Sequence, residues 1–435
     1  MASTRRNFIK TASVLAAGSV ISPELFAGAG KTVAPSDKIR VALIGGNSMG
    51  WSNLTSFLKN PEVECAAMCD IDRNILNKRT DELIKMGQPK PKLYVDYRNM
   101  LENKDIDIVI IGTPDHWHCL MFCDSLEAGK HVYVEKPVGN SIAEINIMQN
   151  AVRKHGKIVQ VGQWQRSQPH FVDAINYLKT GKLGRIRATK AWSFVDWKGA
   201  VPKVPDSPVP AGVDYDRWLG PAPKRPFNAN RFHFTWRWFW EYAGGLMTDW
   251  GVHLIDYILY GMNKSVPVSV MAIGGKYAFP DDAMVTPYTM TAVYDFGDFT
   301  MSWEHTIGIG LGNWRRPHGM AYTGENGTLV LDRQGWEVFP EKDRIEAVPL
   351  QKNVGIGLDL HVRNHLDCIK DNTPQKLNAG INIGRDVALV AQMGNIAFRT
   401  GEKVFWDDKR QAFTTKAANS LITPRYNNGY TLPKY

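Results

Sequence analysis

Residues 38–50 read KIRVALIGGNSMG, and this stretch decides the first half of the fold. The apolar run 39–44 is typical of a buried strand, and residues 45–50 form a glycine-rich turn. A helical pattern follows over residues 52–59. A strand, a tight turn and a helix in this order form a βα unit, so the stretch predicts that the fold begins with an α/β domain.

The rhythm of the remaining segments predicts two domains in this chain of 435 residues. Short apolar strands alternate with helical segments up to residue 162, which indicates a doubly wound parallel sheet of the Rossmann type over residues 38–162. After that, longer strands spaced as hairpins indicate an α+β domain with a large, open, mostly antiparallel sheet over residues 163–405, followed by a tail, 406–435. The expected strands are 63–69, 106–112, 130–134 and 157–161, then 186–194, 266–273, 288–294, 299–304, 318–322 and 328–331.

The glycine-rich turn resembles the dinucleotide fingerprint G-x-G-x-x-G, with Asn47 at the middle glycine position. Asparagine visits left-handed conformations more readily than most residues, so we expect it to be tolerated there. Backbone amides at such a turn can hold a diphosphate at the helix N-terminus. The residues predicted to do so are Gly45, Asn47, Ser48, Met49 and Gly50.

Asp70 predicts which dinucleotide is bound. It follows the second strand, twenty residues after Gly50, where a carboxylate can accept hydrogen bonds from the adenosine ribose. The 2′-phosphate of NADP would meet a like charge at this position. The pattern therefore favours NAD over NADP.

Three further segments carry residues suited to proton and hydride chemistry. Val134-Glu135-Lys136-Pro137 holds a lysine at the end of a strand, and Asp249 lies four residues before His253, which would put both on one face of a helix. Thr113, Pro114 and His118 follow another strand at the same edge of the sheet. The His116-x-His118 spacing has no clustered histidine or cysteine to support it, so we expect no metal site.

Together these motifs resemble the Gfo/Idh/MocA oxidoreductases over about residues 38–405. Supporting features are Thr113-Pro114, the Gly162-x-x-x-Arg166 and Gly324-x-x-Gly327 spacings, and the helix between Gly384 and Gly401. The resemblance implies that Lys136 and His253 flank the reacting carbinol beside the nicotinamide, with Asp249 assisting. Histidine is also the side chain whose ordinary pKa suits a base near neutrality. We expect Thr113, Pro114, His118, Glu135 and Lys136 to line the cofactor site, and Trp164, Gln165, Arg166, Asp249 and His253 the substrate site.

The N-terminus predicts export. Arg5-Arg6 precedes the apolar residues 11–21 and a small-residue site at 27–29, the pattern of a twin-arginine signal peptide over residues 1–29. Eleven apolar residues are too few to span a bilayer, which takes about 20, so we expect a periplasmic protein carried by the Tat machinery, with no stable membrane insertion. The formal charge of +9, with no long basic run, argues against a nucleic-acid partner. The five cysteines are expected to be buried free thiols.

The predicted function is that of an exported NAD-dependent oxidoreductase that oxidises a ring hydroxyl of a sugar or glycoside. One alternative is an NAD-dependent glycosidase that works by transient oxidation and elimination. Another is a noncatalytic dinucleotide- or sugar-binding protein. The second domain resembles one that pairs subunits in the family, which implies a homodimer or homotetramer.

Overall fold

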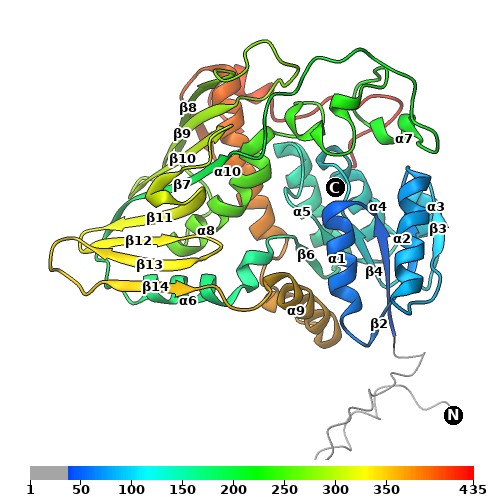
Figure 1. The fold of residues 1–435 in the computed structure, drawn as a ribbon, viewed down its shortest axis with the longest axis horizontal. Coiled ribbons are helices and arrows are strands. Elements are labelled where there is room, and N and C mark those ends of the chain that lie inside the picture. Colours follow the sequence, from blue (N-terminus) through cyan, green and yellow to red (C-terminus); the bar gives the residue numbers. More distant parts are fainter. Residues whose placement is uncertain (1–37) are drawn as a thin grey trace, which may run out of the picture.

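The computed structural model describes residues 38–435, and these residues form two domains that lie side by side (Figure 1). The predicted export signal, residues 1–29, lies outside the described residues. No helix among the described residues is long and apolar enough to cross a membrane. All five cysteines are buried and unpaired, as predicted.

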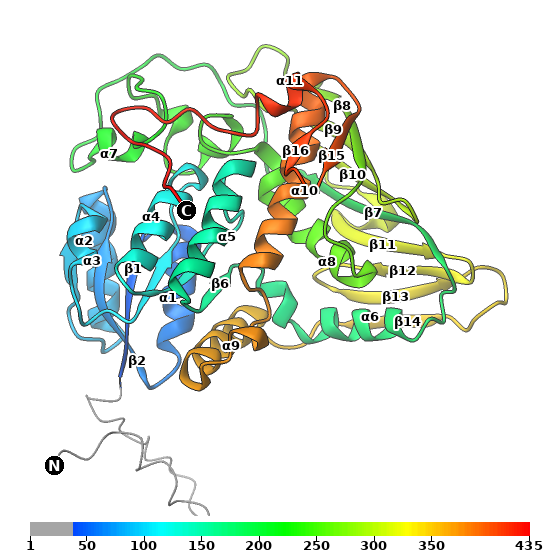
Figure 2. The same ribbon diagram turned by 180° about the vertical axis from the view of Figure 1, so that it is seen from behind.

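The first domain is built on a parallel sheet of six strands in the order β3-β2-β1-β4-β5-β6, which confirms the predicted doubly wound fold. The apolar runs found in the sequence are its central strands, and most of their residues are buried because helices cover both faces (Figure 2). The strands are β1 (Ile39–Ile44), β2 (Val63–Cys69), β3 (Lys92–Tyr94), β4 (Ile108–Ile111), β5 (His131–Val134) and β6 (Val159–Val161). The helices are α1 (Ser48–Leu58), α2 (Arg73–Lys85), α3 (Tyr97–Leu101), α4 (Asp115–Glu127) and α5 (Ile142–His155).

The second domain carries a sheet of ten strands in the order β14-β13-β12-β11-β7-β10-β9-β8-β15-β16. Every strand pair is antiparallel except β7 with β10, so the predicted mostly antiparallel sheet is confirmed. The strands are β7 (Ile186–Val195), β8 (Ser269–Gly275), β9 (Thr289–Asp295), β10 (Thr300–Ile307), β11 (His318–Gly324), β12 (Gly327–Leu331), β13 (Gly335–Pro340), β14 (Val348–Lys352), β15 (Val404–Asp407) and β16 (Ala412–Phe413).

Helices cover one face of this second sheet (Figure 2). The helix α8 (Val252–Met262) packs on β7 and β11, α6 (Pro169–Lys179) on β12 and β13, and α10 (Ile381–Thr400) on β8. Tyr257 and Tyr322 illustrate the packing, because both are fully buried and the Tyr322 hydroxyl donates to the Tyr257 carbonyl over 2.6 Å. The covered face places α8, and the turn before it, between the sheet and the first domain.

Two late segments of the chain return to the first domain and fix its position. The helix α9 (Gly357–Asp371) packs against α1, and its Val362 and Leu366 join the core formed by β1 and β5. After the short helix α11 (Lys416–Asn419), the last residues reach the first domain, where Tyr426 donates to Glu144 of α5 and Tyr430 packs on Trp117 of α4. The two domains are thus joined by more than the linker that follows β6.

Candidate active site

Three glycines let the backbone close tightly at the carboxyl edge of the parallel sheet. A Cβ on Gly50 would lie 2.0 Å from the Gly45 carbonyl oxygen, and one on Gly112 would lie 2.4 Å from the Gly50 Cα. Gly45 itself has φ +86°, which suits glycine. Any side chain at Gly50 or Gly112 would therefore push the turn and β4 apart, at the place where a dinucleotide diphosphate would lie.

Asn47 occupies this turn for a different reason from the one its sequence position predicts. Its φ and ψ are −100° and 161°, so it is extended and not left-handed. The left-handed residue is the neighbouring Ser48, with φ +42°. Asn47 is the N-cap of α1, and its side chain accepts a hydrogen bond from Ser48 N over 3.0 Å. The predicted tolerance for asparagine holds, but the proposed backbone reason was wrong.

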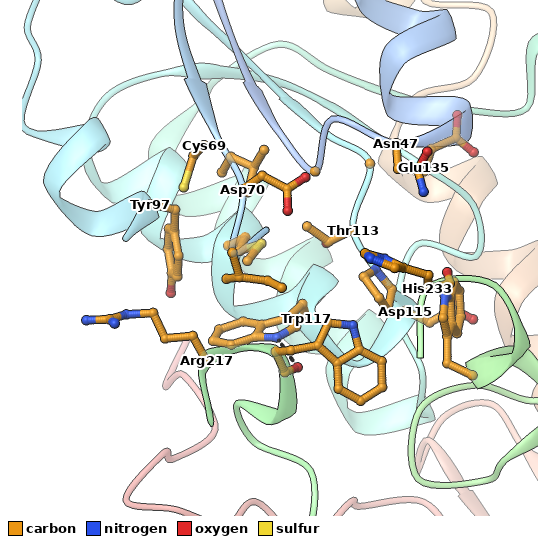
Figure 3. A pocket seen from close by; sticks show the side chains of 18 of the residues that line it. Asn47, Cys69, Asp70, Tyr97, Thr113, Asp115, Trp117, Glu135, Arg217 and His233 are labelled. Carbon is orange, nitrogen blue, oxygen red and sulfur yellow. Dashed lines mark hydrogen bonds between the residues drawn. The ribbon is translucent and has the colours of Figure 1, made fainter. Parts of the chain in front are cut away.

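Asp70 lies at the end of β2 with its carboxylate fixed by the backbone. One oxygen accepts from Gly46 N over 2.8 Å and the other from Asp72 N over 3.0 Å. Burial raises the pKa of Asp70, although these two hydrogen bonds act against the shift. Figure 3 shows Asp70 at the cleft that also contains Thr113, Trp117 and Arg217. The arrangement places a fixed acceptor where the adenosine ribose of a dinucleotide would lie.

The other predicted cofactor residues fall into two groups. Residues that line the cleft are Gly45, Asn47, Ser48, Met49, Asp70, Thr113, Pro114, Glu135 and Lys136. His118 instead lies behind the cleft, completely buried, with Nδ1 2.7 Å from the Pro137 carbonyl oxygen and Nε2 2.9 Å from that of Thr113. His118 therefore links the two loops that carry Thr113 and Lys136, and its predicted direct contact with the cofactor is replaced by a positioning role.

Glu135 supports the loop that presents Lys136. It is buried, accepts a hydrogen bond from Asn53 Nδ2 over 2.9 Å, and accepts another from the Lys136 backbone N over 3.2 Å. Burial raises the pKa of Glu135, while the charge of Lys136 opposes the rise. A side chain at Gly162 would lie 2.8 Å from a Glu135 oxygen, so the Gly162 spacing noted in the sequence makes room for this carboxylate.

The two domains meet at Lys136 and Asp249. Lys136 Nζ donates to the Asp249 Oδ1 and to the Asp249 carbonyl oxygen, both over 2.9 Å. Arg237 Nε lies 3.5 Å from the same Oδ1. Burial alone would raise the pKa of Asp249, but Lys136 and then Arg237 hold it below its ordinary value. Asp249 is therefore ionised and fixes the ammonium group of Lys136 at the cleft.

His253 lies beside this ion pair on the first turn of α8. It is 8% exposed, and its buried Nδ1 has no hydrogen-bond partner among residues 38–435. Burial, and then the charges of Lys136 and Arg333, lower the pKa of His253 well below its ordinary value. The imidazole is thus neutral in the free protein and able to accept a proton.

The turn that carries Asp249 differs from the ordinary helix predicted for this stretch. Met247–Gly251 forms a π-helix, and α8 begins only at Val252. In this wider turn, residues four apart no longer lie directly above one another on one helix face. The Asp249 carboxylate accepts a hydrogen bond from Lys136 and not from His253. The two residues remain close enough for the Asp249 charge to act on the pKa of His253. Asp249 therefore acts on His253 through its charge, and its own hydrogen bonds go to Lys136.

The predicted substrate residues after β6 form a short 3₁₀ turn, Trp164–Ser167. Gln165 accepts hydrogen bonds from Arg333, and its Nε2 lies 3.5 Å from the His253 carbonyl oxygen. Arg166 is bound to Asp256 in a buried ion pair, with Nη2 2.7 Å from Oδ1. Since that charge is already neutralised, the structure gives Arg166 the task of anchoring α8, in place of the predicted sugar contact.

Three charged residues at this site escaped the sequence analysis. Arg237 and Arg333 approach Asp249 and His253 from distant segments, and Asp115 lines the cleft at the start of α4. Burial raises the pKa of Asp115 well above its ordinary value. No local motif marks these residues, although Asp115 follows directly after the predicted Thr113-Pro114. Among the described residues, no group of three or more histidine, cysteine, aspartate or glutamate side chains could hold a metal ion.

The cleft is covered by two segments from outside the parallel sheet. The first runs from β7 to α8, carries the short helix α7 (Tyr215–Leu219), and crosses above the first domain in Figure 1. It is held there by Asp214 N, which donates to the Ile71 carbonyl over 2.9 Å, and by His233 Nε2, 3.0 Å from Asp72 Oδ2. The second is the C-terminal tail, whose Tyr430 also lines the cleft. The first segment is thus attached directly after Asp70, where the adenosine of a dinucleotide would lie.

Comparison with known protein families shows to which family the chain belongs. Residues 39–163 match the model of an oxidoreductase family with an NAD-binding Rossmann fold, and residues 183–432 match its C-terminal alpha/beta domain. The chain belongs to the Gfo/Idh/MocA oxidoreductase family. Its first domain is accordingly an NAD-binding domain, and the glycine corner and Asp70 fit that cofactor.

Curated relatives of this Gfo/Idh/MocA protein include glycosidases. A glycosyl hydrolase family 109 protein of Shewanella baltica is 35% identical over 159 residues, which are 32% of this chain and 35% of the relative. An alpha-N-acetylgalactosaminidase of Shewanella oneidensis is 33% identical over 202 residues, which are 42% of this chain and 44% of the relative. The chain thus matches less than half the length of these relatives.

Solved structures share the fold over a much larger part of the chain. An aldose-aldose oxidoreductase from Caulobacter crescentus superimposes with a TM-score of 0.63 at 20% identity, covering 85% of this chain and 100% of the other. A levoglucosan dehydrogenase in complex with NADH and levoglucosan superimposes with a TM-score of 0.64 at 19% identity, covering 85% of this chain and 99% of the other. At this identity the likeness establishes the two-domain fold.

Proposed function

We propose that this protein is an exported oxidoreductase that uses bound NAD to oxidise a ring hydroxyl of a sugar or glycoside. The observation that carries the proposal is the cluster of Lys136, Asp249 and His253, where an ionised carboxylate fixes a lysine beside a neutral histidine at the NAD cleft. Sugar-acting relatives in the family support the choice of substrate class.

Each residue of the cluster has a distinct task in this proposal. When bound, NAD supplies the hydride acceptor. Lys136 Nζ donates a hydrogen bond to the substrate oxygen and stabilises the negative charge that develops there. His253 takes the hydroxyl proton as hydride leaves the carbon, so that a carbonyl forms. Asp249 holds Lys136 in position through the 2.9 Å ion pair.

A glycosidase that oxidises, eliminates the aglycone and reduces the product again is the second candidate. It is favoured by the identity of 33% to 35% with relatives named as glycosidases. Such a cycle returns the cofactor to its starting state, so the cofactor can remain bound. The two segments that cover the cleft support a retained cofactor in either case.

Export and assembly belong to the same proposal. The twin-arginine pattern in residues 1–29 supports transport of the folded protein by the Tat machinery to the periplasm, where a retained cofactor would be an advantage. The uncovered side of the second sheet bears exposed apolar residues, among them Met271 and Ile273 at 54% and 73% exposure. Such a surface supports a homodimer or homotetramer formed through the sheets.

The test begins with the purified mature protein. Denaturation should release stoichiometric NAD or NADH, identified by mass and absorbance. The intact protein is then incubated with neutral and acidic sugars and with their aryl glycosides. A keto-sugar or net NADH supports the oxidoreductase, whereas aglycone release without net redox change supports the glycosidase. A protein that releases no dinucleotide and does not bind added NAD would contradict both and favour a noncatalytic binding protein.

A further inference from the structure

One partly buried arginine beside the proposed reaction site has no carboxylate partner among residues 38–435. Arg333 lies in the turn between β12 and β13, 4.7 Å from the ring of Trp250 and 5.1 Å from that of Trp164. Trp250 follows Asp249 in the chain, and Trp164 precedes Gln165. The guanidinium group is therefore held between two indole rings at the predicted substrate side of the site.

The neighbouring arginines make the contrast clear. Arg166 is bound to Asp256, Arg237 approaches Asp249, and Arg316 is bound to Asp332 and Glu337. Asp332 precedes Arg333 in the chain but is occupied by Arg316. Among residues 38–435, no carboxylate forms a salt bridge with Arg333.

The hydrogen bonds of Arg333 leave one side of its guanidinium group free. Nε and one Nη both donate to the same oxygen, Gln165 Oε1, each over 3.1 Å. An arginine has a second edge, formed by its two Nη groups, which can bind a carboxylate through two parallel hydrogen bonds. No described residue accepts a hydrogen bond from that edge.

The Asp249 carboxylate forms its ion pairs with cations other than Arg333. The charges of Lys136 and Arg237 act on Asp115 and Glu135 as well as on Asp249, whereas Asp249 is the carboxylate whose charge acts on Arg333. Burial lowers the pKa of Arg333 to about 10, and the Asp249 charge acts against that shift. The diphosphate of NAD would lie at the Gly45–Gly50 turn, on residues of the first domain that do not include Arg333. The cofactor therefore leaves the charge of Arg333 without a partner.

We propose that the substrate is a sugar that carries a carboxylate, such as a hexuronic acid or its glycoside, and that the free edge of Arg333 binds this carboxylate. The proposal rests on the proposed function for the reaction and adds the substrate class. Gln165 and the two tryptophans are the positioning residues, because they fix the plane of the guanidinium group.

The test compares binding and turnover of matched sugars that differ only at one carbon, a hexuronic acid and the corresponding neutral hexose, by calorimetry and by NADH formation. We expect the wild-type protein to bind the acid more tightly and the Arg333→Gln variant to lose about 10- to 100-fold of that binding, with little change for the neutral sugar. Arg333→Lys keeps the charge but loses the edge that makes two hydrogen bonds. Its affinity for the acid should lie between those of the wild type and of Arg333→Gln. Arg187→Gln, at an exposed ion pair with Glu325, is the control and should leave both affinities unchanged.

The outcomes separate the two proposals. Equal binding of acid and neutral sugar by the wild type, or an equal loss of both in Arg333→Gln, would mean that Arg333 only packs between the tryptophans and would overturn the inference. Oxidation of neutral sugars alone would overturn it while leaving the proposed function intact. Selective binding of the acid, lost in Arg333→Gln, would support the inference even if no turnover occurred. Binding of neither sugar, in free form or as its aryl glycoside, would overturn both proposals.

Discussion

Replacing Lys136 by methionine tests the proposed chemistry most directly, because methionine keeps the length of the side chain and removes the ammonium group. That group makes two hydrogen bonds of 2.9 Å to Asp249 and faces the cleft. Removing one donor that stabilises a developing oxyanion costs about 10²- to 10³-fold in kcat, or about 3 to 4 kcal/mol. We therefore expect the rate of hydride transfer to fall by at least about 100-fold.

The same substitution should destabilise the fold by a separate amount. Lys136 and Asp249 are 11% and 17% exposed, so the pair is largely buried. Removing one member of a buried pair costs about 3 to 5 kcal/mol, and we expect the lower end because Arg237 remains 3.5 Å from Asp249. The loss of the Lys136 charge should also raise the pKa of Asp249 and of His253, since that charge lowers both.

The assay is single-turnover absorbance of the bound cofactor at 340 nm, with thermal unfolding measured in parallel. Lys130→Met is a matched control, because Lys130 precedes the same strand, is 4% exposed, and donates to the carbonyls of Asn103 and Ile106 over 2.8 Å each. The Lys130→Met variant should be less stable than the wild type, but its folded molecules should transfer hydride at the wild-type rate. A Lys136→Met protein that retains NAD and transfers hydride within about tenfold of the wild-type rate would refute the assigned role.

Three other predictions address the cofactor and the base. Gly50→Ala should abolish NAD retention, because its Cβ would lie 2.0 Å from the Gly45 carbonyl oxygen; an NAD content equal to the wild type would contradict the tight turn. Asp70→Ser should weaken NAD binding about tenfold and reduce the preference over NADP, as measured by titration with each cofactor; an unchanged preference would place the ribose elsewhere. The pKa of His253 lies well below 6.5, so the base stays unprotonated as the pH falls, and kcat/KM should not decline between pH 7.5 and pH 6. A decline centred near pH 6.5 would mean that His253 is solvated or is not the base.

The sequence predicted most of the fold because the fold depends on local patterns. The apolar runs of the parallel strands lie within two residues of their observed bounds, and residues 63–69 match β2 at both ends. The strands β3, β13, β14, β15 and β16 were missed. β3 and β14 lie at the edges of their sheets and are mostly exposed, so their residues show no clear alternation. A strand that is stabilised by its pairing at the sheet edge leaves little trace in its own sequence.

The candidate site was predictable only where one segment supplies the signal. Lys136, Asp249 and His253 stood out because each belongs to a short motif, and the structure brings all three together. The π-helical turn at Met247–Gly251 and the pairing of Arg166 with Asp256 depend on contacts between segments that are far apart in the chain. Arg333 has no motif at all, and its significance comes from the absence of a carboxylate that only the folded structure reveals.

The charge of Arg333 links the base to the proposed substrate. The charges of Lys136 and Arg333 both disfavour protonation of His253, so they keep it able to accept a proton at neutral pH. A bound carboxylate on Arg333 would cancel one of these charges and raise the pKa of His253, which would make it a stronger base only when the acidic sugar is present. The pH profile of kcat/KM reports the free enzyme, and that of kcat reports the enzyme–substrate complex. If the substrate is acidic, kcat/KM should stay constant down to pH 6. The decline of kcat on the acid side should then begin at a higher pH than that of kcat/KM. Identical limbs for kcat and kcat/KM would show that no anion joins the site with the substrate.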